Sequence, residues 1–202
     1  MKTRRMHIRS TKMNPPRSAA QPLLDQRGKV IQAPGEILYY PLSLAEAARK
    51  ASVEGVNQIL ADTLYLRDML KKHHWQASGA TFYQLHLLFD KFFDEQSELV
   101  DMLGERVQTL GGIAVALPND VVEMTRIARP PRGREEVPVQ LSRLLEALAI
   151  VLAGCHRVVK IARAHGDDGT DNLLSSDVIP TGEKQVWFLS QHLVDTPLVR
   201  AR

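Results

Sequence analysis

Apolar residues recur at helical spacing through most of this chain, and that periodicity limits what the chain can fold into. The clearest example is a seam whose members are three or four positions apart: Leu141, Leu145, Leu148, Leu152, Cys155, Val159 and Ala162. Such spacing places side chains on one face of an α-helix. From residue 42 onward no sustained period-2 alternation indicates a half-buried strand. We therefore predict an all-α protein without strands.

The first two predicted helices precede this seam. The first runs from about 43 to 72 and begins with Ser43 and Glu46 at capping-box spacing. The second runs from about 81 to 110 and is stopped by Gly111-Gly112. Both are long enough to cross a small domain.

Two further helical regions lie beyond that glycine pair. A short helix near residue 120, with Asp120 and Glu123 as a second capping-box pair, lies in the connection between long helices 2 and 3. The last region spans about 170–194, and Pro180 predicts a kink or break in it. Four long helices and one short connector predict a four-helix bundle.

The first 30 residues differ in charge from the rest of the chain. They hold one acid and eight basic side chains: Lys2, Arg4, Arg5, Arg9, Lys12, Arg17, Arg27 and Lys29. Their net charge is +7, which leaves −4 for residues 31–202. Because large apolar residues are also few there, we predict a flexible basic arm over 1–40, a bundle over 41–196 and a short tail over 197–202.

The remaining composition predicts a cytoplasmic protein. The single cysteine, Cys155, excludes an internal disulfide and favours a reducing compartment. Its place on the apolar seam favours an inert packing residue over a reactive thiol. No apolar run approaches the roughly 18 residues of a membrane-crossing helix, and no hydrophobic stretch follows Arg4-Arg5 as a secretory signal requires.

One face of the predicted second helix is acidic. An advance of about 100° per residue brings five carboxylates onto one arc with His86: Asp90, Asp94, Glu98, Asp101 and Glu105. Its apolar residues lie on the opposite side: Leu85, Leu88, Phe89, Phe92, Leu99, Leu103, Val107 and Leu110. A solvated surface is the simplest interpretation of such a stripe. However, carboxylates one turn apart repel each other, and a bound cation reverses that cost.

Two pairs on this face have the spacing of metal ligands. His86 with Asp90, and Asp101 with Glu105, are each one helical turn apart, and imidazole with carboxylate suits iron, manganese or zinc. Asp90 and Asp101 are about 16.5 Å apart along the helix, so the two pairs cannot hold one ion within a single chain. If two copies pack antiparallel about a twofold axis, each pair faces the other and two identical sites form between subunits.

The segment before the second helix supplies a further candidate ligand. His74 lies twelve residues before His86 across a turn at Gly79, and Trp75 beside it is a candidate for screening the site from solvent. A capping histidine and a core tryptophan are the structural alternatives. His73 competes with His74, but adjacent helical side chains diverge by about 100°, so we expect only one of them to face a metal.

Six short motifs occur in a defined order along the chain. They are K-x-x-H-W at 71–75, G-x-x-F at 79–82, L-H-x-x-F-D at 85–90, D-x-x-x-E-R at 101–106, L-G-G at 110–112 and E-K-Q-V-W-F-L at 183–189. In this order they resemble the DNA-protection-during-starvation (Dps) family of miniferritins, within the ferritin-like superfamily, over roughly residues 42–194. The long basic arm and the Pro180-Thr181-Gly182 interruption depart from a minimal member.

The resemblance implies a ferritin-like bundle assembled into a dodecameric cage. By this match the ferroxidase ligands, shared between subunits, are His74, His86, Asp90, Asp101 and Glu105. The implied reaction oxidises Fe(II), with hydrogen peroxide preferred to oxygen, and stores ferric mineral inside, which protects DNA from oxidative damage.

The resemblance also suggests roles for other acidic residues. Asp94 and Glu98 become candidates for passing iron inward or nucleating mineral, with plain surface charge as the alternative. Three acids near the last helix, Asp167, Asp168 and Asp171, resemble residues that line iron-entry pores at threefold axes. A loop that caps a helix is the alternative for these three residues.

Two other functions fit the same sequence. The arm's charge suits a nucleoid protein that mainly coats DNA without base specificity, with these candidate contacts: Lys2, Arg4, Arg5, Arg9, Lys12 and Arg17. The arm can alternatively pack on the cage, aid assembly or bind a metal through His7. The same five ligands can also hold zinc in a redox-inert metal buffer, because ligand type does not fix the metal. No membrane partner is predicted.

Overall fold

The computed structural model describes residues 29–195, and every regular element in that range is helical. The long helices are α1 (Glu46–Gln76), α2 (Phe82–Thr109) and α4 (Val137–Ala164). The short α3 (Pro118–Met124) connects α2 to α4, and α4 is followed by α5 (Asp168–Leu173), a π-helical turn (Leu174–Val178) and α6 (Ile179–Gln191). The predicted all-α class, with a short helix in the second connection, is confirmed. None of the helices in residues 29–195 has a stretch apolar enough to cross a bilayer.

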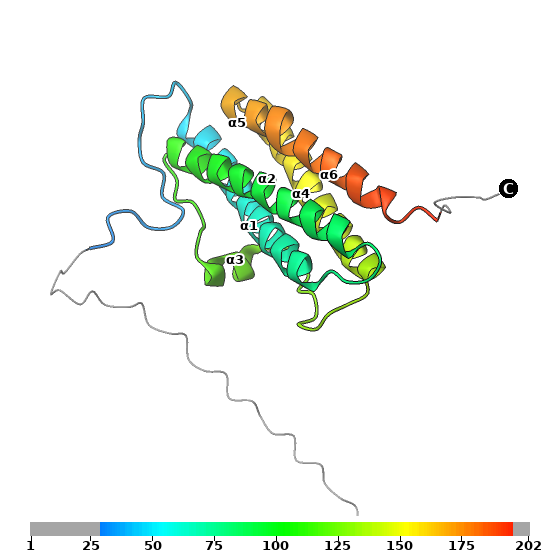
Figure 1. Ribbon diagram of the computed structural model, residues 1–202. Coiled ribbons are helices and arrows are strands. Elements are labelled where there is room, and N and C mark those ends of the chain that lie inside the picture. Colours follow the sequence, from blue (N-terminus) through cyan, green and yellow to red (C-terminus); the bar gives the residue numbers. More distant parts are fainter. Residues whose placement is uncertain (1–28, 196–202) are drawn as a thin grey trace, which may run out of the picture. The chain divides into compact units, whose positions relative to one another are not determined.

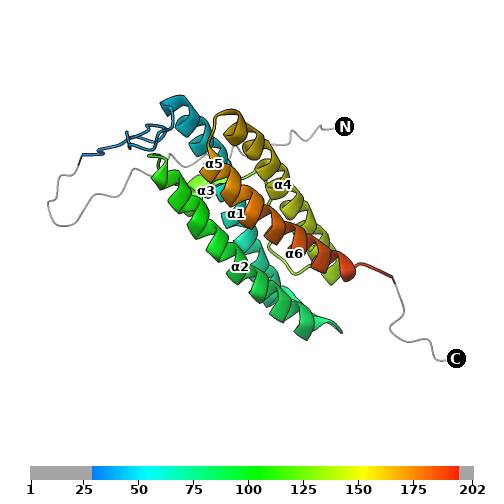
Figure 2. The same cartoon turned by 90° about the horizontal axis from the view of Figure 1, so that it is seen from above.

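The helices form a bundle in which α1 lies against both α2 and α4 (Figure 1). Helix α6 packs along α4. The bundle closes where Gln96 of α2 donates to Gln185 of α6 at 2.9 Å, both side chains being buried. Figure 2 shows α2 and α6 beside each other when the bundle is seen from above. Because α5, the π turn and α6 follow one another without a gap, they serve together as the fourth long helix.

The core is built from the helix faces that the apolar periodicity predicts. Phe89 and Leu103 of α2 are fully buried, as are Leu141 and Cys155 of α4. Burial of each large apolar side chain contributes about 1.5–3 kcal/mol, so this core is the main source of stability. The acidic face of α2 consequently remains outside the bundle.

The turn after α2 holds the segment that precedes α1. Gly111 has a φ of +87°, and a Cβ there would lie 2.3 Å from the carbonyl oxygen of Leu38. The Leu38 N–H donates to the Gly111 carbonyl at 2.9 Å, and the buried Arg49 guanidinium donates to the Leu38 carbonyl. The compact unit that contains the bundle begins at Gln32, whereas the boundary predicted from charge lies at residue 41.

The two predicted capping boxes are wrong. Ser43 has a φ of 56°, and α1 begins after Ala45, which has no side-chain cap. Helix α3 begins at Pro118, which places Asp120 inside its first turn rather than at its cap. Proline suits that first position because the N–H that it lacks would have no partner in the helix.

Pro180 does not end the last helix. Proline removes one backbone donor and its ring clashes with the preceding turn of an α-helix. The π turn just before α6 accommodates the proline, because it holds one more residue per hydrogen-bonded turn than an α-helix. Gly182 then allows close packing on α4, since a Cβ there would lie 2.9 Å from Cδ2 of Leu152.

Candidate metal centre

Two histidines meet where α1 ends and α2 begins. The rings of His74 and His86 stack at 20° with centroids 3.7 Å apart. Nδ1 of His74 lies 2.7 Å from the backbone carbonyl oxygen of His86, and Nδ1 of His86 lies 3.1 Å from that of His74. The turn between the helices thus brings together two residues that are twelve positions apart.

These contacts set the tautomer of both rings. A carbonyl oxygen can only accept a hydrogen bond, so each Nδ1 carries the proton and donates it. In a neutral imidazole the lone pair then lies on Nε2, which has no hydrogen-bond partner within residues 29–195 in either ring. An imidazole held through one nitrogen with the other nitrogen free is the arrangement of a metal-ligating histidine.

Asp90 lies one turn after His86 and next to the same pair of rings. Its Oδ1 is 3.8 Å from Nδ1 of His74 and accepts a hydrogen bond from Lys71 Nζ. The Lys71 hydrogen bond is the main reason that the pKa of Asp90 is lowered, and the nearby histidines act in the same direction. The Lys71 ammonium also lies 4.3 Å from the ring centroid of Phe93. Asp90 is therefore ionised at neutral pH and already has a cation beside it.

Asp101 and Glu105 lie on the same face of α2 but away from the histidines. Both side chains are exposed, and neither makes an ion pair or side-chain hydrogen bond with any described residue. They line a groove of about 800 Å³ together with Arg67 of α1. Residues 29–195 contain no group of three or more His, Cys, Asp or Glu side chains that could hold a metal ion within the single chain.

The rest of the acidic stripe is also on the surface. Asp94 and Glu98 are exposed and have no ion-pair partner in the described part of the chain. Glu95, between them in sequence, is instead bound by Lys91 and Lys184. The mineral-nucleating role of Asp94 and Glu98 stays a prediction.

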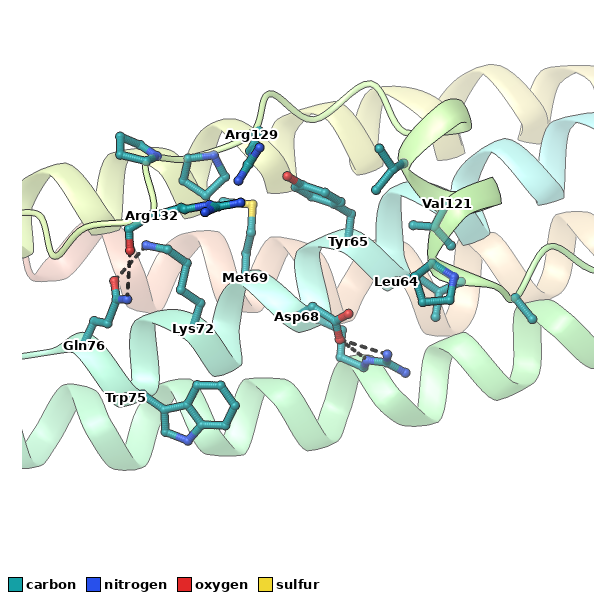
Figure 3. Close-up of a pocket in the computed structure, with 16 residues that line it drawn as sticks. Leu64, Tyr65, Asp68, Met69, Lys72, Trp75, Gln76, Val121, Arg129 and Arg132 are labelled. Carbon is teal, nitrogen blue, oxygen red and sulfur yellow. Dashed lines mark hydrogen bonds and ion pairs between the residues drawn. The ribbon is translucent and has the colours of Figure 1, made fainter. Parts of the chain in front are cut away.

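The residues before and after His74 in the sequence, His73 and Trp75, have different surroundings from the histidine pair. His73 is fully buried, neither of its ring nitrogens has a hydrogen-bond partner among the described residues, and burial lowers its pKa to about 4. It is therefore a neutral core residue. Trp75 is 69% exposed and is among the residues that line a different groove (Figure 3). Within one subunit Trp75 therefore does not cover the histidine pair.

The three acids near α5 have separate surroundings. Asp167 is fully buried, accepts from the Thr170 N–H as the cap of α5, and pairs with Arg106 of α2. Asp171 pairs with Arg163, whereas Asp168 is exposed. The helix-capping alternative thus describes Asp167, and the pore role stays a prediction.

The predicted DNA contacts cannot be located in the structure. Lys2, Arg4, Arg5, Arg9, Lys12 and Arg17, together with His7, lie outside the described residues. Lys71 is the residue whose role the sequence reasoning missed. Its spacing of three from His74 places both on one face of α1, which is the signal that could have revealed it.

Comparison with known proteins agrees with the motifs. Residues 53–199 match the Ferritin family model, described as a ferritin-like domain. The solved structure of DpsC from Streptomyces coelicolor has a TM-score of 0.84 and 52% sequence identity, covering 85% of this chain and all of that one. An archaeal Dps homologue from Halobacterium salinarum shares the fold, with a TM-score of 0.82 at 24% identity, over 86% of this chain and 97% of that one.

Curated sequences give the same picture. An uncharacterised protein of Kitasatospora aureofaciens is 49% identical over 134 residues, which cover 66% of this chain and 89% of that protein. The nutrient stress-induced DNA-binding protein of a Synechococcus strain is 30% identical over 155 residues, covering 77% of this chain and 88% of that protein.

Proposed function

The chain belongs to the Dps family of ferritin-like proteins, and we propose that it is a ferroxidase that oxidises Fe(II) at sites shared between subunits. Iron storage and DNA protection are the general functions of this family. We propose further that the assembly is a dodecameric cytoplasmic cage, that hydrogen peroxide is preferred to oxygen, and that ferric mineral is stored inside.

The observation that carries the proposal is the mutual contact of His74 and His86. It leaves Nε2 of both rings without a hydrogen-bond partner within residues 29–195, and the ionised carboxylate of Asp90 lies 3.8 Å from Nδ1 of His74; nitrogen with carboxylate oxygen suits iron. These three side chains do not by themselves form a group that could hold a metal ion within residues 29–195, so the proposed site is incomplete in one chain.

The missing ligands are proposed to come from a second copy. Asp101 and Glu105 are exposed carboxylates without a counter-ion among the described residues, a cost that a metal ion would remove. The same helix exposes large apolar side chains that a neighbouring subunit would cover, since Leu87 is 49% exposed and Met102 is 38% exposed. A twofold axis between two α2 helices creates both sites at once.

The proposed chemistry balances with peroxide as the oxidant. Two ferrous ions each give one electron, the oxygen–oxygen bond of one peroxide breaks, and hydrolysis of the two ferric ions releases protons. Asp90, Asp101 and Glu105 supply hard oxygen ligands, which favour the ferric product over the ferrous substrate. Consumption of peroxide together with Fe(II) also prevents formation of hydroxyl radicals, which is how such a reaction protects DNA.

Subunit mixing tests the shared site. One variant carries His74→Ala, and the other carries Asp101→Asn with Glu105→Gln, so each homogeneous assembly lacks one half of every site. Co-expression makes mixed assemblies, in which some pairs contain one subunit of each variant. In such a pair one site combines the intact His74 of one subunit with the intact Asp101 and Glu105 of the other, and the second site lacks both halves. Random mixing at equal amounts should restore about a quarter of the wild-type initial rate of peroxide-driven Fe(II) oxidation.

A matched control is the pair Asp120→Asn with Glu123→Gln, which removes the same charge from exposed positions of α3. This variant should oxidise iron at the wild-type rate. Mixed assemblies that native mass spectrometry identifies, but that remain inactive, would contradict a site built from two subunits. A redox-inert zinc buffer predicts zinc binding by the wild type without rapid iron oxidation.

Non-specific DNA binding is a second candidate function. It is favoured by the charge of +7 on residues 1–30, which each subunit would contribute if the cage forms. Removal of residues 1–28 should weaken binding to duplex DNA and flatten its salt dependence in a gel-shift titration. An unchanged titration would exclude the arm as a DNA contact.

A further inference from the structure

The connection from α3 to α4 concentrates positive charge. Residues 31–202 contain 18 basic and 22 acidic side chains, yet four of the basic ones fall within nine residues: Arg126, Arg129, Arg132 and Arg134. Arg126 is occupied by the buried Asp62. The other three, which we call the arginine loop, are exposed, and their guanidinium groups make no ion pair or hydrogen bond within residues 29–195.

This loop is anchored to the bundle on both sides. Before it, the fully buried Asp62 of α1 accepts from the Arg126 N–H at 2.7 Å and from its Nε at 3.0 Å. After it, Gln140 of α4 donates to the Glu135 carbonyl at 2.7 Å. Pro130-Pro131 restricts the backbone between these anchors. The three arginines therefore start from a fixed backbone, which lowers the entropy cost of binding a partner.

The loop forms one side of a groove of about 490 Å³ on the outer face of α1. Arg129 and Arg132 line it with Lys72, and Tyr65 adds an aromatic face (Figure 3). The acid that lines the groove, Asp68, is already paired with Arg67, and the nearby Glu135 is paired with Arg143. Arg129 and Arg132 therefore line the groove without a counter-ion among the described residues.

We propose that the arginine loop binds the phosphate backbone of duplex DNA without base specificity, as a contact separate from the N-terminal arm. Guanidinium groups form bidentate hydrogen bonds with phosphate, and they remain charged at every physiological pH. Duplex DNA presents a regular series of phosphate charges, so three guanidinium groups on one loop can contact several phosphates without reading the base sequence.

The test compares two full-length variants of equal charge. The loop variant carries Arg129→Gln, Arg132→Gln and Arg134→Gln. The control variant carries Lys50→Gln, Arg157→Gln and Lys160→Gln, which are exposed positions without ion pairs in the described part of the chain. Each is titrated with a duplex of mixed sequence at several salt concentrations. Native mass and the iron oxidation rate are measured in parallel, so failure of the iron site is distinguished from failure of the DNA contact.

The loop variant should bind DNA roughly tenfold or more weakly at 100 mM salt, and its salt dependence should lose up to about three units of log–log slope for each loop in contact. The control variant should stay within about twofold of the wild type, and both should retain the wild-type mass and oxidation rate. Equal losses in the two variants would show a general charge effect and overturn the proposal. A changed mass in the loop variant would also overturn it, because the arginines would then hold an acidic surface of a neighbouring copy.

Discussion

His74 and His86 each bind the backbone of the other. Every Nδ1 donates to the partner residue's carbonyl oxygen, at 2.7 and 3.1 Å, and the rings stack between these two contacts. The arrangement joins the end of α1 to the start of α2. It also leaves Nε2 of each ring free for the proposed coordination, so that one contact serves both the fold and the proposed site.

Replacement of His86 should separate these two roles. Asparagine places an amide donor near the position of Nδ1 and has no counterpart of Nε2, so His86→Asn should keep the bond to the His74 carbonyl and lose the ligand. We expect the initial iron oxidation rate to fall by at least about tenfold and the stability to change by less than about 1 kcal/mol. His86→Ala should lose the hydrogen bond as well and be about 1 kcal/mol less stable than His86→Asn. Wild-type oxidation by His86→Asn would remove Nε2 from the ligand set.

Lys71 should compete with a metal ion for Asp90. Its ammonium group already neutralises that carboxylate, so Lys71→Met should bind a divalent ion more tightly, roughly threefold to tenfold after solvent screening. The pKa of Asp90 is lowered mainly by this lysine, so it should rise in the variant. Protons should then compete with the metal at a higher pH than in the wild type. Cobalt(II) absorption titrated between about pH 4 and 8 measures both effects, and weaker binding by Lys71→Met at pH 7 would contradict them.

Helix positions in this chain were predictable because burial repeats with the helical period. The seam on α4 and the two faces of α2 depend on spacing within one helix, which a sequence contains. The starts of α1 and α3 were predicted wrongly because a cap depends on backbone angles, and Ser43 adopts a positive φ that its residue type does not signal. Pro180 was expected to disturb its helix, but accommodation by a π turn depends on packing against α4.

The candidate site was likewise predictable from the sequence only in part. The ligand types and the shared face of α2 follow from intervals of four residues within one helix. The ion pair of Lys71 with Asp90 spans 19 residues and depends on the register between α1 and α2, which periodicity does not fix. The proposed opposite half of the site, Asp101 with Glu105, would come from a second subunit, so contacts within one chain do not test it.

Cys155 should be unreactive in the folded protein. It is fully buried on α4, and desolvation raises its pKa to about 12. At pH 8 only about one thiol in ten thousand is then ionised, and the thiolate is the reactive species. A disulfide reagent should therefore label this thiol only after denaturant unfolds the chain. Rapid labelling under native conditions, with the helical circular dichroism signal intact, would show that α4 opens locally.

Arg106 should stabilise the bundle through Asp167. Burial alone would raise the pKa of Asp167, but hydrogen bonds from Thr170 and the charge of Arg106 outweigh it, so the pKa is lowered. Removal of one partner of a buried ion pair leaves an uncompensated charge, so Arg106→Met should cost about 3 kcal/mol at pH 7. For a chain of this size that is a fall of roughly 6–12 °C in Tm. Arg163→Met, which breaks the exposed pair with Asp171, is the matched control and should cost less than about 1 kcal/mol.

The pH dependence distinguishes a lost ion pair from lost packing at Arg106. A carboxyl group whose pKa is lowered on folding stabilises the protein above its unfolded pKa, near 3.9, and this stabilisation disappears as the pH falls through the folded value. In Arg106→Met the pKa of Asp167 should rise, because only the hydrogen bonds to this carboxylate then oppose the effect of burial. The Tm difference between wild type and Arg106→Met should therefore be largest near neutral pH and shrink toward pH 3, measured at one subunit concentration. A difference that stays constant over this range would mean that Arg106 acts through its alkyl chain rather than its charge.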